Sequence, residues 1–144
     1  MRKFSISRDA SVLKKALERY PLFEGVSDPE TWLKNRRNFM LVENDNIALF
    51  ERFGSGERRD FGAHILFEAR GAEAKKLYLD MARYAYNSKI IAADIIFSVV
   101  SKTNKKAVYF IKNCLRVPVY EGNVNNIVFV MDKETFLKLH SVIN

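Results

Sequence analysis

The sequence predicts an α+β fold, in which a mixed, mostly antiparallel sheet carries one parallel strand pair at its centre and helices on both faces. Two apolar runs of strand character, residues 62–69 and 95–100, are separated by an amphipathic helical stretch. Strands joined through a single helix pair in parallel, by a right-handed crossover. Hairpin signals at residues 44–46 and 122–123 flank this unit and predict antiparallel strands on either side of it.

The N-terminal part predicts a short strand and two helices. Residues 4–6 alternate apolar and polar side chains, as a strand does. Asp9 is placed to cap a helix, because its carboxylate accepts hydrogen bonds from free N–H groups of the first turn, and Pro21 ends that helix. Asp28 followed by Pro29 is a second start signal, since proline is favoured at the first helical position.

A β-hairpin is predicted next. The apolar runs 39–42 and 47–50 flank residues 44–46, which read Asn-Asp-Asn and tolerate the left-handed backbone angles of a tight turn. A polar loop over residues 54–59 then leads into the strand at 62–69. We expect that strand to pair antiparallel with the second strand of the hairpin.

The helix after the central strand has the clearest amphipathic pattern in the chain, and Asn87 and Ser88 end it. Its apolar stripe, spaced three and four residues apart, consists of Ala74, Leu77, Tyr78, Met81, Ala82 and Ala85. The strand at 95–100 is apolar almost throughout, as expected where both faces of a sheet are covered.

The C-terminal part predicts a helix, a hairpin and a closing helix. Asn104 is placed to cap a helix with an apolar face. Residues 117–120 and 127–131 form a hairpin, and a short helix over 133–140 follows. We expect His140, near the end of the chain, to be exposed.

Composition limits the class of protein. The 144 residues suffice for one domain, and we expect residues 1–144 to form a single one. No apolar run approaches the roughly 18 residues of a bilayer-spanning helix, and the N-terminus lacks a signal-peptide pattern. One cysteine fits the cytoplasm, and two histidines spaced far from it predict no metal site. The net charge of +7 favours polyanions, including nucleic acid and phosphorylated cofactors.

The order of elements and the turn after the central strand resemble the acyl-CoA N-acyltransferases of the GNAT superfamily. In that superfamily the two central strands splay apart and hold the pantetheine arm of acetyl-CoA. The pyrophosphate sits on a turn written Q/R-x-x-G-x-G/A at the following helix N-terminus. Here residues 70–75 read R-G-A-E-A-K, which keeps the common Arg-Gly opening and puts Glu73 in place of the next glycine. The resemblance implies acetyl-CoA as cofactor, held by Leu66, Phe67, Arg70, Gly71, Ala72, Glu73 and Ala74.

A second motif of the superfamily, N-x-x-A-x-x-L/F-Y-x-K-x-G-F, is matched in part on the next predicted helix. Asn104, Ala107 and Phe110 match, and Ile111 replaces the tyrosine that usually gives a proton to the leaving thiolate. The resemblance therefore implies further cofactor contacts at Asn104, Lys105 and Phe110. The resemblance also places three cations near the adenine and 3′-phosphate, namely Lys102, Lys105 and Lys106. They are candidate phosphate contacts, and the alternative is a solvated basic face.

Two side chains on the central strand are candidates for the base that deprotonates the amine. In the superfamily a strand carboxylate near the split takes this proton, directly or through water, and Glu68 lies late on the strand. His64 shares the face of Glu68, because alternate residues of a strand point to one side, so the two side chains can pair. The alternatives are an exposed Glu68 and a structural His64.

Three functions follow from these patterns. The first is an acetyl-CoA-dependent N-acyltransferase of the cytoplasm, acting on an amine of a small molecule or a protein. The sequence is also similar to divergent acetyltransferase-like proteins of tailed bacteriophages. That likeness implies a catalytically inactive GNAT-fold protein of the host cytoplasm, as a homodimer or a virion-assembly partner, and Ile111 and Glu73 favour it. The third is a nucleic-acid-binding module, which rests on charge and on Arg36, Arg37, Arg58 and Arg59.

Overall fold

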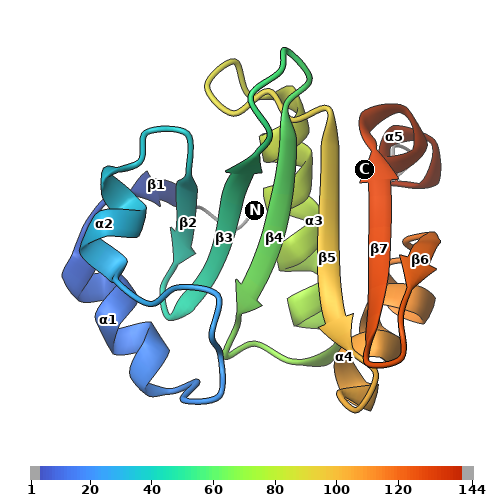
Figure 1. The fold of residues 1–144 in the computed structure, drawn as a ribbon, viewed down its shortest axis with the longest axis horizontal. Helices are drawn as coiled ribbons and strands as arrows, with labels where there is room; N and C mark the ends of the chain where they lie inside the picture. The colour runs from blue at the N-terminus through green and yellow to red at the C-terminus, as the bar shows by residue number, and fades with distance from the viewer. Residues whose placement is uncertain (1–3, 141–144) are drawn as a thin grey trace.

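The computed structural model describes residues 4–140, which form a seven-stranded sheet with the order β1-β2-β3-β4-β5-β7-β6 (Figure 1). The strands are β1 Ser5–Ser7, β2 Phe39–Glu43, β3 Asn46–Phe53, β4 Asp60–Leu66, β5 Ile95–Ser101, β6 Val119–Gly122 and β7 Asn126–Asp132. Neighbours are antiparallel except β4 and β5, which are parallel. The predicted mixed sheet with a central parallel pair is confirmed.

Helices cover both faces of the sheet. α1 and α2 lie in front of the half that holds β1 to β3, and α3 lies behind the centre (Figure 1). The helices are α1 Ala10–Glu18, α2 Pro29–Lys34, α3 Gly71–Asn87, α4 Lys105–Tyr109, the π-helical turn η1 Phe110–Cys114, and α5 Lys133–His140. None of the helices within residues 4–140 has the length and apolar composition that a bilayer span requires.

The predicted helix starts and the hairpin turn are confirmed. The Asp9 carboxylate accepts a hydrogen bond from the Ser11 N–H at 2.9 Å, and the Asp28 carboxylate accepts one from the Glu30 N–H at 3.1 Å. Asn44 has a φ of 53°, the left-handed backbone that the turn between β2 and β3 requires. These local signals set where the two helices begin and where the hairpin turns.

The core has two parts, one on each side of the sheet. The larger part, between the sheet and α3, includes Phe50, Phe61, Leu77, Met81 and Phe129. The smaller part, between the sheet and the pair α1 and α2, includes Leu13, Trp32, Leu33, Leu49 and Leu66. Side chains of alternate residues on β3 and β4 therefore belong to different parts of the core, as strand geometry requires.

β4 and β5 meet only at one end. All seven residues of β4 pair with β3, and all seven residues of β5 pair with β7. Between β4 and β5, pairing runs only from Asp60–Ile95 to Gly62–Phe97. Beyond this point the two ribbons separate (Figure 1). The sheet thus consists of two antiparallel halves joined by a short parallel contact.

The gap between β4 and β5 is a wedge, which is closed at the end where the two strands pair. Arg59 holds the two segments together at this closed end. Its backbone N–H donates to the Asp94 carboxylate at 2.8 Å, and its Nε donates to the Ile91 carbonyl oxygen at 2.7 Å. The Asp94 N–H donates back to the Arg59 carbonyl oxygen at 2.9 Å. The loop that enters β5 is therefore tied to the residue that precedes β4.

The bounds of the central strand differ from the prediction. β4 spans Asp60–Leu66 rather than residues 62–69, because its first residues pair with the end of β3. At the other end, the side-chain oxygen of Asn46 accepts hydrogen bonds from the N–H groups of Glu68 and Ala69, each at 2.8 Å. These two residues therefore leave the sheet while their N–H groups stay bonded.

Two features of the C-terminal third also differ from the prediction. The helix capped by Asn104 widens to π geometry, in which the Leu115 N–H donates to the Phe110 carbonyl oxygen at 2.9 Å, five residues back. His140, which we expected to be exposed, is 2% exposed. Its Nε2 lies 2.9 Å from the Leu115 carbonyl oxygen and its ring packs against Phe136, since α5 folds back over the sheet.

Candidate active site

A narrow apolar cavity lies beside the point where β4 and β5 separate. Residues from both strands, α3, η1, β7 and α5 line it, among them Ile65, Tyr78, Ser98, Ile111, Leu115, Phe129 and His140. The space inside is about 20 Å³, enough for about one water molecule. A chain-like ligand therefore enters this opening only if the lining side chains move apart.

Backbone groups of β4 face the opening. The Ser98 hydroxyl donates to the Ala63 carbonyl oxygen at 3.3 Å, so the peptide groups of residue 63 point toward β5. Residues two apart on a strand direct their N–H and C=O groups to the same side, so those of Ile65 also point toward β5. Because β4–β5 pairing ends at Gly62, the Ile65 N–H is a donor directed into the opening.

The turn between β4 and α3 combines a left-handed glycine with a helix N-terminus. Gly71 has a φ of 61°, and the Arg70 side chain does not cap α3. That side chain instead donates from Nη1 to the carbonyl oxygens of Phe67 at 2.6 Å and Ala69 at 3.0 Å. Glu73 is exposed in the first turn of α3. A helix N-terminus without a side-chain cap attracts anions.

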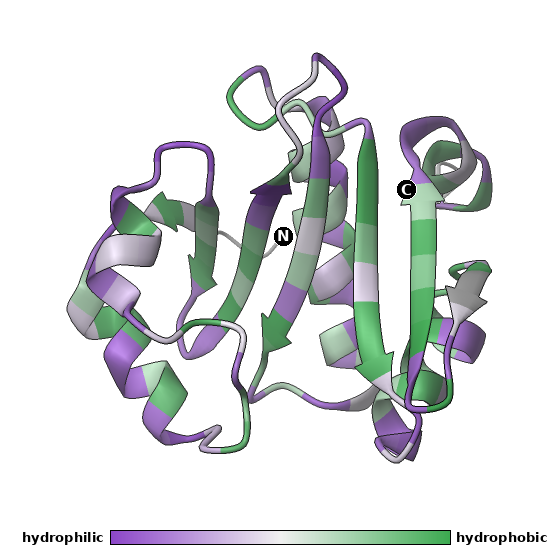
Figure 2. Ribbon diagram, viewed as in Figure 1, coloured by the Kyte–Doolittle hydropathy of each residue, from purple (hydrophilic) through white to green (hydrophobic). Residues whose placement is uncertain are grey.

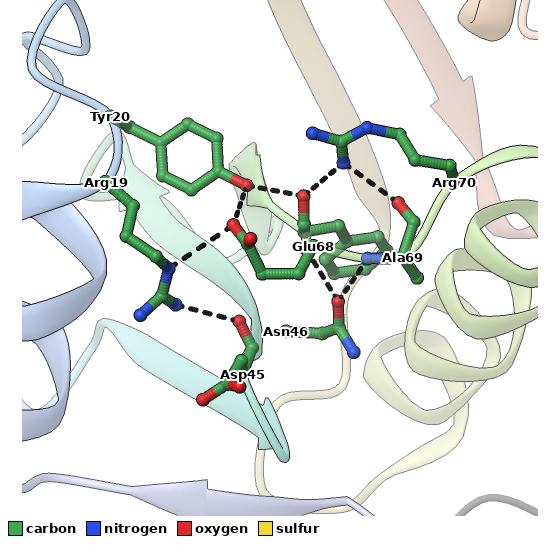
Figure 3. A network of polar contacts seen from close by, with 8 residues as sticks. Arg19, Tyr20, Asp45, Asn46, Glu68, Ala69 and Arg70 are labelled. Atoms are coloured by element: carbon green, nitrogen blue, oxygen red, sulfur yellow. Dashed lines mark hydrogen bonds and ion pairs between the residues drawn. The ribbon is translucent and has the colours of Figure 1, made fainter.

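Glu68 belongs to a polar network that ties α1 to this turn (Figure 3). Its carboxylate accepts hydrogen bonds from the Tyr20 hydroxyl at 2.8 Å and from Arg19 Nε at 3.3 Å. Tyr20 also donates to the Phe67 carbonyl oxygen, and Arg19 donates to the Asp45 carbonyl oxygen at 3.0 Å. The hydrogen bond from Tyr20 and the charge of Arg19 lower the pKa of Glu68. This carboxylate is ionised and weakly basic.

His64 lies on the face of β4 that α1 and α2 share, beside a carboxylate other than that of Glu68. Its Nε2 is 3.6 Å from Glu51 Oε1 on β3, and the ring of Phe23 packs edge-on against the imidazole at 5.2 Å. The expected pairing of His64 with Glu68 is therefore replaced by a cross-strand pair. Burial lowers the pKa of His64, and the charge of Glu51 partly opposes this shift. The imidazole is neutral at pH 7, with a side chain still 30% exposed.

The second motif is placed at the start of α4 and along η1. The Asn104 side chain caps the helix by accepting from a backbone N–H at 3.2 Å, Lys105 is exposed, and Phe110 is half-buried. Ile111 lines the cavity, so the residue in the family's tyrosine slot does face the opening but has no proton to give. Tyr109 is 62% exposed and points elsewhere.

Two tyrosines of α3 line the same cavity. The Tyr86 hydroxyl donates to the Met131 carbonyl oxygen at 2.5 Å. Burial raises the pKa of both Tyr78 and Tyr86 above the ordinary value for a phenol. Both phenols therefore carry their protons at neutral pH. The bond to Met131 gives the Tyr86 hydroxyl a structural role in the core. It gives none to the Tyr78 hydroxyl, which is the other phenol on this wall.

The structure places the predicted site residues around one opening but in separate groups. Residues 70–74 form the turn, Asn104, Lys105 and Phe110 begin the next helix, and Leu66 and Phe67 are buried side chains on opposite faces. Four neighbours of these groups were not singled out from the sequence, namely Tyr20, Asn46, Glu51 and Tyr78. Glu51 lies opposite Gly62 in the register of β3 and β4, so assigning that register from the sequence would have placed Glu51 near His64.

Comparisons with known proteins give a consistent fold. No protein-family model and no curated protein sequence matches the chain. A SpeG spermidine N-acetyltransferase variant from Vibrio cholerae aligns over 94% of this chain and 95% of its own, with a TM-score of 0.71 and 12% identity. Apo FdhC, a nucleotide-linked sugar GNAT, aligns over 94% and 88%, with a TM-score of 0.67 and 14% identity. The fold is that of the GNAT N-acetyltransferases.

A further GNAT-fold structure contains the cofactor. PseH, an N-acetyltransferase from Campylobacter jejuni solved with acetyl coenzyme A, aligns over 92% of this chain and 99% of its own. Its TM-score is 0.60 and its sequence identity is 15%. At such identities the likeness extends to the GNAT fold, so the roles of individual residues have to be argued from the geometry of this chain.

The left-handed turn predicts a specific stability effect. Gly71→Ala should lower the free energy of unfolding by about 1–2 kcal/mol, because an alanine is strained in this conformation. Urea denaturation measures the change. Gly56→Ala is the matched control, since Gly56 lies in an open loop without a positive φ; it should change stability by less than about 0.5 kcal/mol. Equal effects in both variants would contradict the turn geometry.

Proposed function

We propose that this protein is an acetyl-CoA-dependent N-acyltransferase that acts on a primary amine. The observation that carries the proposal is the wedge between β4 and β5, with the Ile65 N–H directed into it and an uncapped helix N-terminus at its open end. This arrangement offers one donor to a thioester carbonyl and a group of backbone donors to a diphosphate. The PseH structure with acetyl coenzyme A supports the choice of cofactor.

The residues present fit a phosphorylated cofactor at two places. The backbone of Gly71 and Ala72 would hold the pyrophosphate, since Gly71 lets the chain turn sharply onto the helix. The exposed ammonium of Lys105, in the first turn of α4, would meet a further phosphate. Acetyl-CoA supplies an activated acyl group, and the chain supplies the binding, the polarising N–H and the proton transfers.

His64 is the base that we favour for the amine. It is neutral at pH 7, partly exposed, and stands beside Glu51, whose charge stabilises the imidazolium formed when the proton arrives. Glu68 is the second candidate, but its hydrogen bond from Tyr20 stabilises the ionised form and makes it a weaker base. We assign the proton for the leaving thiolate to Tyr78, because Ile111 cannot supply it.

The alternative is a GNAT-fold protein that binds a partner without catalysis, for instance in virion assembly. Ile111 favours it, because the side chain that lines the cavity in the usual tyrosine slot is apolar. Glu73 favours it as well, because it adds a negative charge where a diphosphate would approach. The two functions differ in whether acetyl-CoA binds at all.

Acetyl-CoA at about 100 times its dissociation constant should stabilise the protein by about 2.7 kcal/mol. A thermal-shift titration measures this. Ala72→Glu should abolish the shift, because a second carboxylate would repel the pyrophosphate, while the fold tolerates an acid in the first turn of a helix. Val124→Glu, at an 87% exposed position in the turn between β6 and β7, is the control for added charge and should keep the shift. An unchanged melting point in millimolar acetyl-CoA would favour the non-catalytic alternative.

The base assignment predicts a pH profile. The rate kcat/KM should fall with acid at a pH below 6.5, the ordinary value for histidine, because burial lowers the pKa of His64. Protonation of the amine substrate also lowers kcat/KM in acid, and the fall caused by His64 adds to that decline. Glu51→Gln should move it to lower pH, since the carboxylate raises the pKa of His64. His64→Gln should lower kcat by about 10²-fold or more. If Glu68→Gln has that effect and His64→Gln does not, Glu68 is the base.

The assignment of Tyr78 predicts a selective loss of turnover. Tyr78→Phe should lower kcat by about 10-fold or more, because the thiolate would leave without a proton, and should keep the acetyl-CoA thermal shift. The loss should shrink with an acyl donor whose thiol is more acidic. Tyr86→Phe is the control on the same cavity wall, since the Tyr86 hydroxyl is bonded to Met131. Equal losses of kcat in the two variants would remove Tyr78 from the mechanism.

A further inference from the structure

The half of the sheet that α1 and α2 do not cover presents an apolar surface. Ile96, Phe129 and Met131 belong to the core behind the sheet, so the alternate residues of β5 and β7 point to the front. With the end of β3 they form what we call the open face: Phe53, Ile95, Phe97, Val99, Val128 and Val130. Figure 2 shows that β5 and β7 are hydrophobic over most of their length, with no helix in front of them.

Two members of the open face are strongly exposed, although they are large apolar side chains. Val99 is 58% exposed and Phe53 is 43% exposed. The rings of Phe53 and Phe97 meet edge to face at 5.0 Å. Gly62 makes this possible, because a Cβ there would lie 2.9 Å from the Phe53 ring and 3.2 Å from the Phe97 ring. An aromatic pair therefore lies directly on the backbone where the parallel ladder ends.

The open face adjoins the proposed base. His64 lies two residues beyond Gly62 on β4 and points to the same side of the sheet, as does Glu51, which pairs with Gly62 across β3 and β4. An amine held at His64 would therefore extend the rest of its molecule over the rings of Phe53 and Phe97 and along Val99. The α1 and α2 layer bounds this region on the other side (Figure 1).

The apolar side chains of the open face offer no carboxylate to a second ammonium group. Among strand residues whose side chains the structure describes, the acids beside the open face are Glu51, Asp60 and Asp132. Glu51 pairs with His64, Asp60 with Arg58 at 2.8 Å, and Asp132 accepts from the Thr135 N–H at 2.7 Å. A polyamine needs a carboxylate beside each further charge, and the apolar side chains of Phe53, Phe97 and Val99, over which the rest of the molecule would lie, offer none.

We propose that the acceptor is a primary amine carried on an apolar or aromatic group with no second positive charge, and that this group packs on the open face. This proposal rests on the proposed function for the identity of the site. It separates the protein from the spermidine acetyltransferases that share its fold. The net charge of +7 also disfavours a second copy of this chain as the occupant of the face.

Calorimetric titration of the full chain with three amines tests the proposal. 2-Phenylethylamine should bind at least about 10-fold more tightly than ethylamine, because its phenyl ring leaves water when it packs on the open face. Spermidine should bind no more tightly than ethylamine. With acetyl-CoA present, product analysis by mass spectrometry should give the same order of kcat/KM.

Variants at Val99 locate the binding surface. Val99→Asp should reduce the preference for 2-phenylethylamine over spermidine by about 10-fold, and Val99→Thr, which keeps a β-branched side chain and guards against misfolding, should reduce it less. Val124→Asp, at an exposed apolar position in the turn between β6 and β7 that is not a member of the open face, should leave the preference unchanged.

Other results would overturn the proposal. Spermidine binding as tightly as 2-phenylethylamine would overturn it, as would a preference that survives both Val99 variants. A dimer seen by sedimentation and dissociated by Val99→Asp would assign the face to a second copy. Because the amines are titrated without acetyl-CoA, these outcomes are independent of the acetyl-CoA thermal shift, which decides the proposed function.

Discussion

The incomplete parallel ladder between β4 and β5 is the constraint on which the rest of the site depends. Every residue of β4 is paired in register with β3 and every residue of β5 with β7, whereas β4 and β5 pair with each other only up to Gly62 and Phe97. Peptide groups of β4 are thereby left facing an opening inside the sheet. An interior strand normally has partners on both sides, and here the missing partner is where a ligand would lie.

Side chains from distant parts of the chain, rather than a run of glycines, hold the turn that follows β4. The Asn46 side chain accepts hydrogen bonds from the N–H groups of Glu68 and Ala69. The side chains of Tyr20 and Arg70 both donate to the Phe67 carbonyl oxygen (Figure 3). Gly71 is the residue of this turn with a positive φ, whereas position 73 lies in ordinary helical backbone, which explains why the side chain of Glu73 is tolerated where the family motif has a glycine. The turn can thus keep its shape with a divergent sequence.

The sequence predicted the fold well because its signals are local. The caps at Asp9 and Asp28, the Asn44 turn and the periodicity of α3 each specify one element, and chain connectivity makes β4 and β5 parallel.

The site was predicted less completely, because its pairs come from register and from packing between distant segments. Glu51 meets His64 only through the β3–β4 register, and Tyr20 meets Glu68 across 48 residues of sequence. Burial of His140 likewise follows from how α5 packs, which its position near the chain end does not reveal.

The hydrogen bonds of Arg59 have a geometric consequence. They lie at the apex of the angle between β4 and β5, where Arg59 joins Ile91 and Asp94. In any pair of diverging rods, a small rotation about the apex produces its largest displacement at the far tips, which here carry the β4–α3 turn and the start of α4. Residues 90–94, which lie at the closed end, can therefore set the width of the gap, and substitutions there would change that width without changing any residue that lines the opening.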